Sequence, residues 1–291
     1  MKKYFLIALP ILLLSSCKDV IQVDLKKGET LLVVDAFIND YASPQTVRLT
    51  TTADYFSNAH TPPAIGATVS LTDLTNNKTY AFAGDGNGNY LYLPQAGDSM
   101  AQIGHNYQLN VTYNGVNYMA LSKLNRTTTI DTILFKRKKG GTEDTNALPK
   151  KYFPYLIAQD APGATDYYWI KTYRNGVFYN GPGQLNVVQD AGGTGTDGLF
   201  FIPPNAFFIL TPDNEAPEYL DNCTIEIYSI NAETYDFFLQ LSTQMSNSQA
   251  GLFATAPENV RTNIKNTSGY GMKSIGWFNM GAISSKSAIA R

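Results

Sequence analysis

The residues whose types and spacing best support a chemical step lie near the start of the chain. An aliphatic residue and two small ones precede a cysteine in Leu14, Ser15, Ser16 and Cys17. This pattern resembles a bacterial lipobox, in which small side chains let a peptidase reach the backbone and the cysteine thiolate accepts diacylglycerol. The alternative is an ordinary cleaved leader followed by a chance cysteine. We expect lipidation at Cys17, which would then be the first residue of the mature chain.

The residues before this cysteine have the layout of a secretory signal peptide. Lys2 and Lys3 precede a mostly apolar run over residues 4–14, and such a run is too short to remain as a membrane-spanning helix. Two palmitate-like acyl chains anchor a protein stably, because each buried methylene contributes about 0.8 kcal/mol. We therefore predict a signal peptide over residues 1–16, a lipidated tether over 17–30 and attachment to the outer membrane. The periplasmic face and the cell surface both remain open.

The rest of the chain contains few His or Cys residues that could bind a metal or act as a nucleophile. The only histidines are His60 and His105, and the only cysteine besides the lipobox is Cys223. No pair among them has the spacing of a zinc site, and no Gly-x-Ser-x-Gly elbow is present. With Cys17 lipidated, Cys223 has no intrachain disulfide partner, and we expect it to pack as a small buried residue. We predict no catalytic set, no metal and no cofactor.

One acidic segment has the opening rhythm of a calcium loop. Asp85, Asn87 and Asn89 alternate with glycines, but Tyr90 stands where glycine is required and Ala96 where a bidentate glutamate is required. We interpret this segment as a hairpin turn. A glycosidase needs only two suitably placed carboxylates, and a chain with 24 acidic residues could supply them. A hydrolase therefore remains an alternative.

Composition favours a β-rich extracytoplasmic protein. Charged residues make up only 16% of the chain, whereas Tyr and Phe number 19 and 15. The formal net charge is −2 and becomes more negative once Lys2 and Lys3 are removed with the leader. Nucleic-acid binding requires a strongly basic face, so we predict no nucleic-acid partner.

Short strands with turn signals predict a β-sandwich domain, immunoglobulin-like or prealbumin-like, over residues 31–125. Strand-like alternation occurs at 46–50 and 67–71. Residues 107–113 and 116–120 flank Asn114-Gly115, the preferred pair for a tight hairpin turn.

A second β-rich domain with one helix is predicted over residues 126–291. Strands are expected at 130–135 and in a hairpin around Arg174-Asn175-Gly176, and six glycines predict a long loop over 181–198. Asn231 is the expected N-cap of a helix that ends near Asn247. The helix residues expected to pack on the sheet are Tyr235, Phe238, Leu239 and Met245.

Two loops are the candidate recognition surfaces. Tyr55, Phe56 and His60 lie in a loop with two prolines, and aromatic side chains there could stack on sugars or other flat ligands. The glycine-rich segment 181–198 is the second candidate. The alternative is that both loops only connect strands.

The whole expected mature chain resembles a Bacteroidota lipoprotein family, domain of unknown function 4249 (DUF4249). The motifs that carry this resemblance follow the family's order, and they include residues 33–36, 65–69, 104–109, 130–133, 160–163, 257–260, 263–264 and 269–270. Near the end, Ile275-Gly-Trp-Phe278 stands where the family often has an aliphatic-Gly-Tyr-Phe run.

The resemblance implies an association with TonB-dependent outer-membrane transporters, which members of the family commonly accompany. We therefore expect a non-enzymatic cell-envelope lipoprotein that assists such a transporter by binding, with an exposed apolar patch as its contact surface. The alternatives are a surface glycan-binding protein or hydrolase with a carboxylate pair, and an adhesin or assembly factor. The sequence does not identify a ligand.

Overall fold

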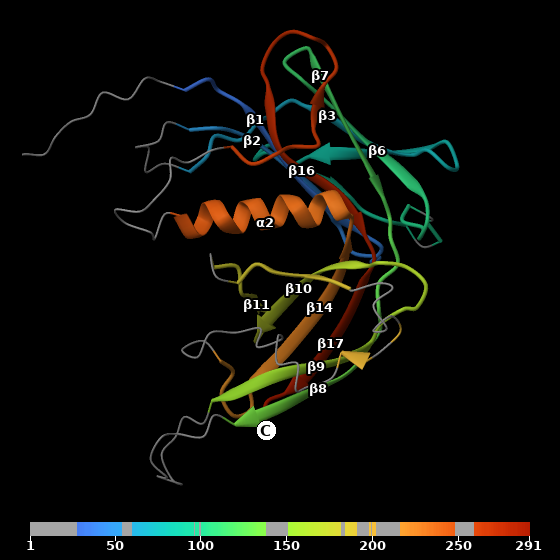
Figure 1. The fold of residues 1–291 in the computed structure, drawn as a ribbon. Coiled ribbons are helices and arrows are strands. Elements are labelled where there is room, and N and C mark those ends of the chain that lie inside the picture. The colour runs from blue at the N-terminus through green and yellow to red at the C-terminus, as the bar shows by residue number, and fades with distance from the viewer. Residues whose placement is uncertain are drawn as a thin grey trace, which may run out of the picture.

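A computed structural model of the chain describes residues 28–53, 60–95, 97–98, 100–137, 151–181, 184–190, 198, 200–201, 216–247 and 259–291. These residues form a mainly β structure in which the helix α2 (Ala232–Asn247) lies between two β-rich units (Figure 1). The predicted all-β class is therefore confirmed. Within the described residues, no helix is both long and apolar enough to cross a membrane.

The first unit is built on a nine-stranded sheet with the order β15-β7-β6-β3-β4-β5-β2-β1-β16. Side chains alternate along these strands, so that one face of each strand enters a common apolar core. Asn114 and Gly115 both have positive φ in the turn between β6 and β7, as predicted. The strands are β1 (Leu32–Asn39), β2 (Gln45–Thr51), β3 (Thr68–Asp73), β4 (Lys78–Gly84), β5 (Asn89–Tyr92), β6 (Asn106–Tyr113), β7 (Val116–Lys123), β15 (Lys265–Asn266) and β16 (Ser274–Gly281).

The two ends of this sheet approach each other and nearly close it around the core. The backbone N–H of Met280 in β16 donates to Ser122 Oγ in β7 at 2.9 Å. Asn263 bridges the same region, because its side chain both donates to the Phe278 carbonyl at 2.7 Å and accepts from the Phe278 N–H at 3.0 Å. Side-chain hydrogen bonds thus replace a backbone ladder at the closure.

Strand pairing crosses the predicted division into 31–125 and 126–291. β16 pairs in parallel with β1, and β15 pairs with β7, so residues from the end of the chain complete the first sheet. A local strand pattern does not specify such partners, because Leu32 pairs with Ser274 and Met119 with Lys265, far away in the sequence.

The second unit is a small sandwich of two sheets. Buried aliphatic residues from both sheets meet between them, with the buried thiol of Cys223 among them. One sheet contains β10 (Tyr167–Arg174), β11 (Val177–Phe178), β12 (Asn186–Gln189), β14 (Asn222–Ile230) and β17 (Ile283–Ile289), and the other contains β8 (Ile130–Arg137), β9 (Tyr152–Gln159) and β13 (Phe200–Phe201).

The prediction of a loop throughout 181–198 is wrong at β12, which pairs with β10. Val187 packs in the cluster beneath the helix and Val188 in the cluster between the two sheets, so both faces of this strand are covered. Residues 182–183, 191–197 and 199 lie outside the described part of the chain.

A bend at Gly281 carries the chain from the first unit to the second. β16 ends at Gly281 and β17 begins two residues later, so one nearly continuous strand serves both units. A Cβ at Gly281 would lie 2.2 Å from the Ser229 carbonyl oxygen, so only glycine fits this close approach.

Of the residues predicted to pack on the sheet, Tyr235 and Phe238 do so and Leu239 does not. Phe237 and Phe238 are buried and Tyr235 is half-buried, whereas Leu239 is 43% exposed. The expected role of Leu239 in packing is therefore wrong, because the face turned toward both units runs through Phe237 and Leu241 instead.

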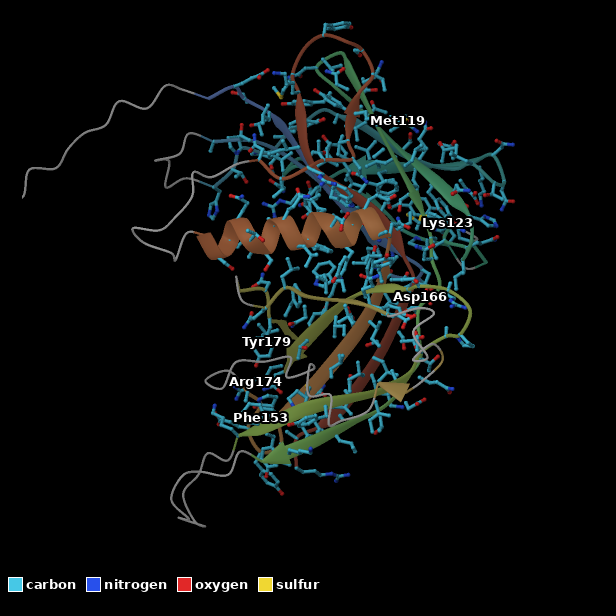
Figure 2. All side chains as sticks on the ribbon, viewed as in Figure 1. Met119, Lys123, Phe153, Asp166, Arg174 and Tyr179 are labelled. Atoms are coloured by element: carbon cyan, nitrogen blue, oxygen red, sulfur yellow. The ribbon has the colours of Figure 1, made fainter. Side chains whose placement is uncertain are left out.

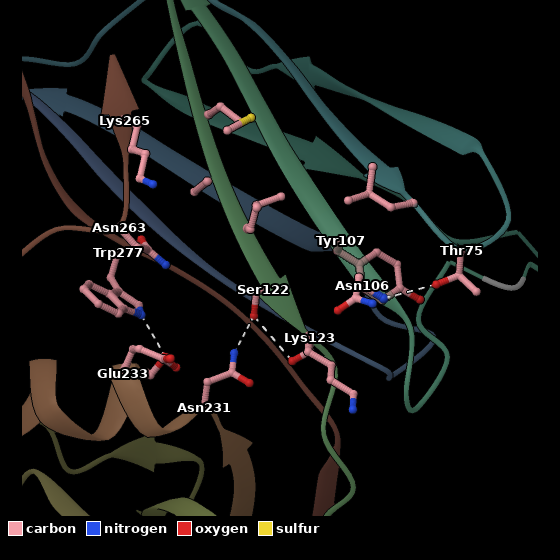
Figure 3. A pocket seen from close by; sticks show the side chains of 15 residues that line it. Thr75, Asn106, Tyr107, Ser122, Lys123, Asn231, Glu233, Asn263, Lys265 and Trp277 are labelled. Atoms are coloured by element: carbon pink, nitrogen blue, oxygen red, sulfur yellow. Dashed lines mark hydrogen bonds between the residues drawn. The ribbon is translucent and has the colours of Figure 1, made fainter. Parts of the chain in front are cut away.

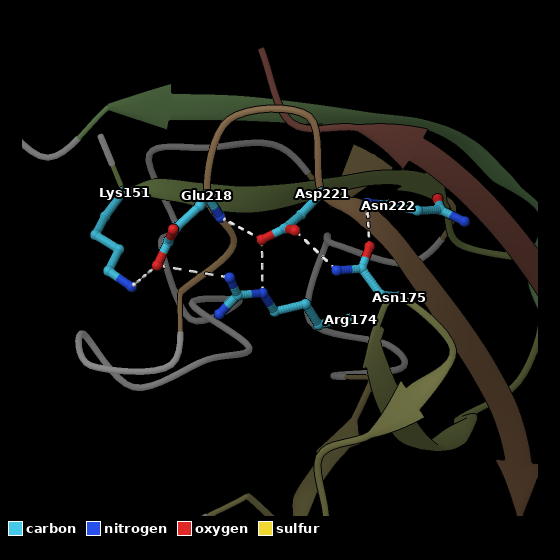
Figure 4. A network of polar contacts seen from close by, with 6 residues as sticks. All are labelled: Lys151, Arg174, Asn175, Glu218, Asp221 and Asn222. Carbon is cyan, nitrogen blue, oxygen red and sulfur yellow. Dashed lines mark hydrogen bonds and ion pairs between the residues drawn. The ribbon is translucent and has the colours of Figure 1, made fainter. Parts of the chain in front are cut away.

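The distal end of the second unit holds a network of paired charges (Figure 4). Arg174 Nε donates to Asp221 Oδ2 at 2.6 Å, and Arg174 Nη2 lies 3.6 Å from Glu218 Oε1. Lys151 Nζ reaches the same glutamate oxygen at 2.8 Å. Asn175 donates to Asp221 Oδ1 at 2.8 Å, so each of these charges has a partner and the two adjacent turns are fixed together.

Candidate functional site: a groove beside the helix N-terminus

Most residues predicted for recognition or modification lie outside the described part of the chain. This applies to Cys17 and its lipobox residues Leu14, Ser15 and Ser16, and to Tyr55 and Phe56. His60 is described and exposed. Lipidation at Cys17 and recognition by the loop therefore stay predictions.

His105, one of the two histidines considered for metal or acid–base chemistry, has a structural partner. His105 Nδ1 lies 2.8 Å from Asp73 Oδ2, and the Asp73 carboxylate also accepts from the backbone N–H of Thr75 at 2.9 Å. Among the described residues, no cluster of three His, Cys, Asp or Glu side chains could hold a metal ion.

The calcium-like segment is a hairpin turn, as interpreted. Asp85 Oδ1 accepts from the backbone N–H groups of Asn87 at 2.7 Å and Asn89 at 3.1 Å, and β4 and β5 pair on either side. The carboxylate therefore stabilises the turn in the way usual for aspartate.

A groove of about 700 Å³ lies where the first unit meets the start of α2 (Figure 3). Four parts of the chain line it: the paired strands β6 and β7 with the turn after β3, the first turn of α2, the segment from Asn263 to Lys265, and Trp277 in β16. These parts are far apart in the sequence, so the groove exists only in the folded chain.

A buried hydrogen-bond network forms the floor of the groove. The Asn231 side chain donates to Ser122 Oγ at 2.8 Å and to Asn279 Oδ1 at 3.3 Å, and Thr234 Oγ1 donates to the same asparagine oxygen at 2.8 Å. The Trp277 indole N–H donates to Thr234 Oγ1 at 2.8 Å. This network holds the start of α2 against β7 and β16 of the first unit.

Asn231 precedes the helix as predicted, but its side chain makes hydrogen bonds to residues outside the helix. Its oxygen accepts from Asn125 Nδ2 at 2.8 Å, in the connection between the two units. The sequence pattern of an N-cap thus marked a residue that joins the units.

Exposed apolar side chains form one wall of the groove. Val116, Tyr118 and Ala120 in β7 point into the core, and alternation therefore turns Met119 and Leu121 outward. Leu121 is 54% exposed and Leu74, from the turn after β3, is 42% exposed. Figure 2 shows Met119 and Lys123 on β7 at this side of the molecule.

Two cations flank this apolar wall. Lys123, at the end of β7, and Lys265, in β15, are exposed and line the groove with Glu233 from the first turn of α2. Among the described residues, neither lysine lies within ion-pair distance of a carboxylate. Both ammonium groups are therefore open to an external anion.

This arrangement is suited to binding. Among the described residues that line the groove, one is a carboxylate, Glu233. Apolar side chains beside unpaired lysines fit a surface with an apolar centre and an acidic rim.

Sequence reasoning missed the groove, although a signal was present. The core-facing alternation in β7 predicts polar residues at the outward positions, and Met119 and Leu121 break that rule. Lys265 gave no comparable signal, because it reaches the groove through long-range pairing of β15 with β7.

A comparison with protein families matches residues 18–287 to the model described as Domain of unknown function (DUF4249). The chain belongs to the DUF4249 family. The match covers both units and confirms the resemblance to DUF4249 drawn from the sequence motifs. A search of curated proteins finds no match to this DUF4249 chain.

Proposed function

We propose that this DUF4249 protein is a non-enzymatic cell-envelope lipoprotein that is anchored to the outer membrane through Cys17 and assists a TonB-dependent transporter by binding. The leader and lipobox support the anchor, and the family resemblance supports the kind of partner. The groove is the observation that carries the binding role.

The chemistry of the groove specifies what its partner must offer. The exposed side chains of Leu74 and Leu121 favour an apolar contact, since removing apolar surface from water stabilises an interface by roughly 25 cal/mol per Å². Lys123 and Lys265 favour acidic side chains around that contact. We therefore expect an exposed transporter loop that has apolar residues flanked by Asp or Glu.

The test is an affinity purification from the native membrane, with the tag at the exposed Arg291. After gentle solubilisation, mass spectrometry is expected to identify one stoichiometric outer-membrane barrel. Recovery of the lipoprotein alone would contradict a stable transporter complex.

A matched pair of variants locates the contact. Leu121→Glu places a negative charge in the groove, and Leu93→Glu places one at a residue that is 60% exposed and lines neither described cleft. We expect the barrel to be lost with Leu121→Glu and retained with Leu93→Glu. Equal recovery with both would place the contact elsewhere.

A further inference from the structure

A second cleft, of about 310 Å³, lies on another side of α2 and differs from the groove in its chemistry. It is bounded by β1 and β16 of the first unit, by α2, and by β10, β11 and the segment before β12 of the second unit. Six aromatic side chains line it: Phe37, Trp169, Phe178, Phe237, Phe238 and Trp277.

These rings hold one another in place. Phe37 stacks on Phe238 with centroids 5.4 Å apart and an interplanar angle of 16°. Trp277 stacks on Phe237 at 4.5 Å and 17°. Trp169 lies 4.9 Å from Phe238 and meets Phe178 edge-on at 6.2 Å. Because the rings come from both units and the helix, the fold itself builds the aromatic lining.

Several of the apolar side chains remain only half-buried. Phe37, Trp169, Phe178 and Leu241 keep part of their surface open, although each contributes to a packed cluster or ring pair. A ligand that covered them would gain apolar burial without rearranging the core.

One carboxylate gives the cleft a directional polar group. Asp35 points outward from β1 and lines the cleft together with Asn180 and Gln184. Desolvation by the surrounding protein raises the pKa of Asp35, and the positive charges of Arg48 and Lys171 lower it in part. Asp35 can accept a hydrogen bond from a ligand N–H or O–H group.

The charges around the cleft are internally offset. Lys171 Nζ lies 4.2 Å from the centroid of the Trp169 ring and 4.7 Å from that of Tyr228, so the protein's own cation covers one face of each ring. Lys171 and Arg48 face Asp35, and Glu226 faces Lys171. Among the described residues, these two cations and two carboxylates balance, so we expect no preference for a charged ligand.

We propose that the aromatic cleft binds a neutral, planar aromatic molecule whose edge carries an N–H or O–H donor. Its rings would lie against Phe37 and Trp169, and its donor would reach the Asp35 carboxylate. This binding would use the cleft alone and does not depend on transporter binding in the groove.

N-phenyl-1-naphthylamine is a suitable probe because it is neutral and aromatic and has a single N–H. The chain has two tryptophans, Trp169 and Trp277, and both line the cleft. Energy transfer from tryptophan to the bound probe therefore reports occupancy directly. The test uses residues Lys18 to Arg291, which contain every strand and helix that the structure describes.

We expect saturable energy transfer at one site per chain. Phe178→Ala, in the two-residue strand β11, and Asp35→Ala, on the outer face of β1, should each weaken probe binding about tenfold. Asp35→Asn retains an acceptor oxygen and should lose less. Circular dichroism establishes that each variant is folded.

Leu121→Glu distinguishes the two sites, because Trp277 lines both the cleft and the groove. It should leave probe binding unchanged. Absence of saturable transfer would overturn the proposal. So would equal binding by wild type, Phe178→Ala and Asp35→Ala, or loss of binding with Leu121→Glu alone.

Discussion

The groove beside α2 and the charged network at the distal end of the second unit use the same residue types in opposite ways. In the network, Lys151 and Arg174 are both paired with carboxylates. In the groove, Lys123 and Lys265 have no carboxylate partner among the described residues and stand beside exposed apolar side chains. Paired charges stabilise the fold, whereas unpaired charges beside apolar surface are available to a partner.

Of the substitutions considered, one in the hydrogen-bonded floor of the groove should cause the largest loss of stability. Asn279 is fully buried, and its side chain donates to the Ser229 carbonyl and accepts from Thr234 and Asn231. Asn279→Leu leaves these groups unpaired, and each buried unpaired group costs about 1–3 kcal/mol. We expect a loss of about 3 kcal/mol or more in the free energy of unfolding, measured by urea denaturation.

The matched control is Asn76→Leu, at an exposed turn residue, which should change stability by less than about 0.5 kcal/mol. A similar small change with Asn279→Leu would show that the network does not hold the units together.

Removing a paired cation should cost more stability than removing an unpaired one. Arg174→Ala removes two contacts to carboxylates and should lower the free energy of unfolding by about 1 kcal/mol after allowance for solvent screening. Lys123→Ala and Lys265→Ala should each stay within about 0.5 kcal/mol of wild type. Urea denaturation in parallel checks this difference. Equal losses of unfolding free energy at all three positions would show that the paired and unpaired cations contribute equally to stability.

The stabilisation that Asp221 contributes should depend on pH, and this effect should be smaller. Desolvation raises the pKa of Asp221, but hydrogen bonds from Asn175 and the Glu218 N–H and the charge of Arg174 outweigh it, so the pKa is lowered overall from 3.8. A carboxyl whose pKa is lowered by folding stabilises the fold above its unfolded pKa. That contribution is lost as pH falls through the folded pKa.

The stability difference between wild type and Asp221→Asn should therefore shrink as pH falls below about 4. Thermal unfolding midpoints measured across this range test the prediction. A difference that stays constant with pH would show that Asp221 acts through shape alone.

The strands and the helix could be predicted where the signal is local. Asn114-Gly115 and Asn175-Gly176 marked hairpins because both central residues of such turns adopt positive φ, and they do so here. The parallel pairing of β16 with β1 could not be predicted in this way, since no local pattern specifies a partner so distant in the chain.

The candidate site, too, could be predicted only where the sequence signal is local. The loop containing His60 drew attention because of its composition, whereas the groove is assembled from β7, α2 and β15. Leu121 was visible as an apolar residue at an outward strand position. The role of Asn231 was hidden, because capping and joining the units use the same residue type.

Quantitative affinity purification compares the binding roles of the groove and the charged network directly. The tagged wild type, the double variant Lys123→Glu/Lys265→Glu and Arg174→Ala would be recovered from native membranes. We predict that the double variant loses the outer-membrane barrel while keeping wild-type stability, and that Arg174→Ala keeps the barrel. Full recovery of the barrel with the double variant would show that Lys123 and Lys265 do not contribute to transporter binding.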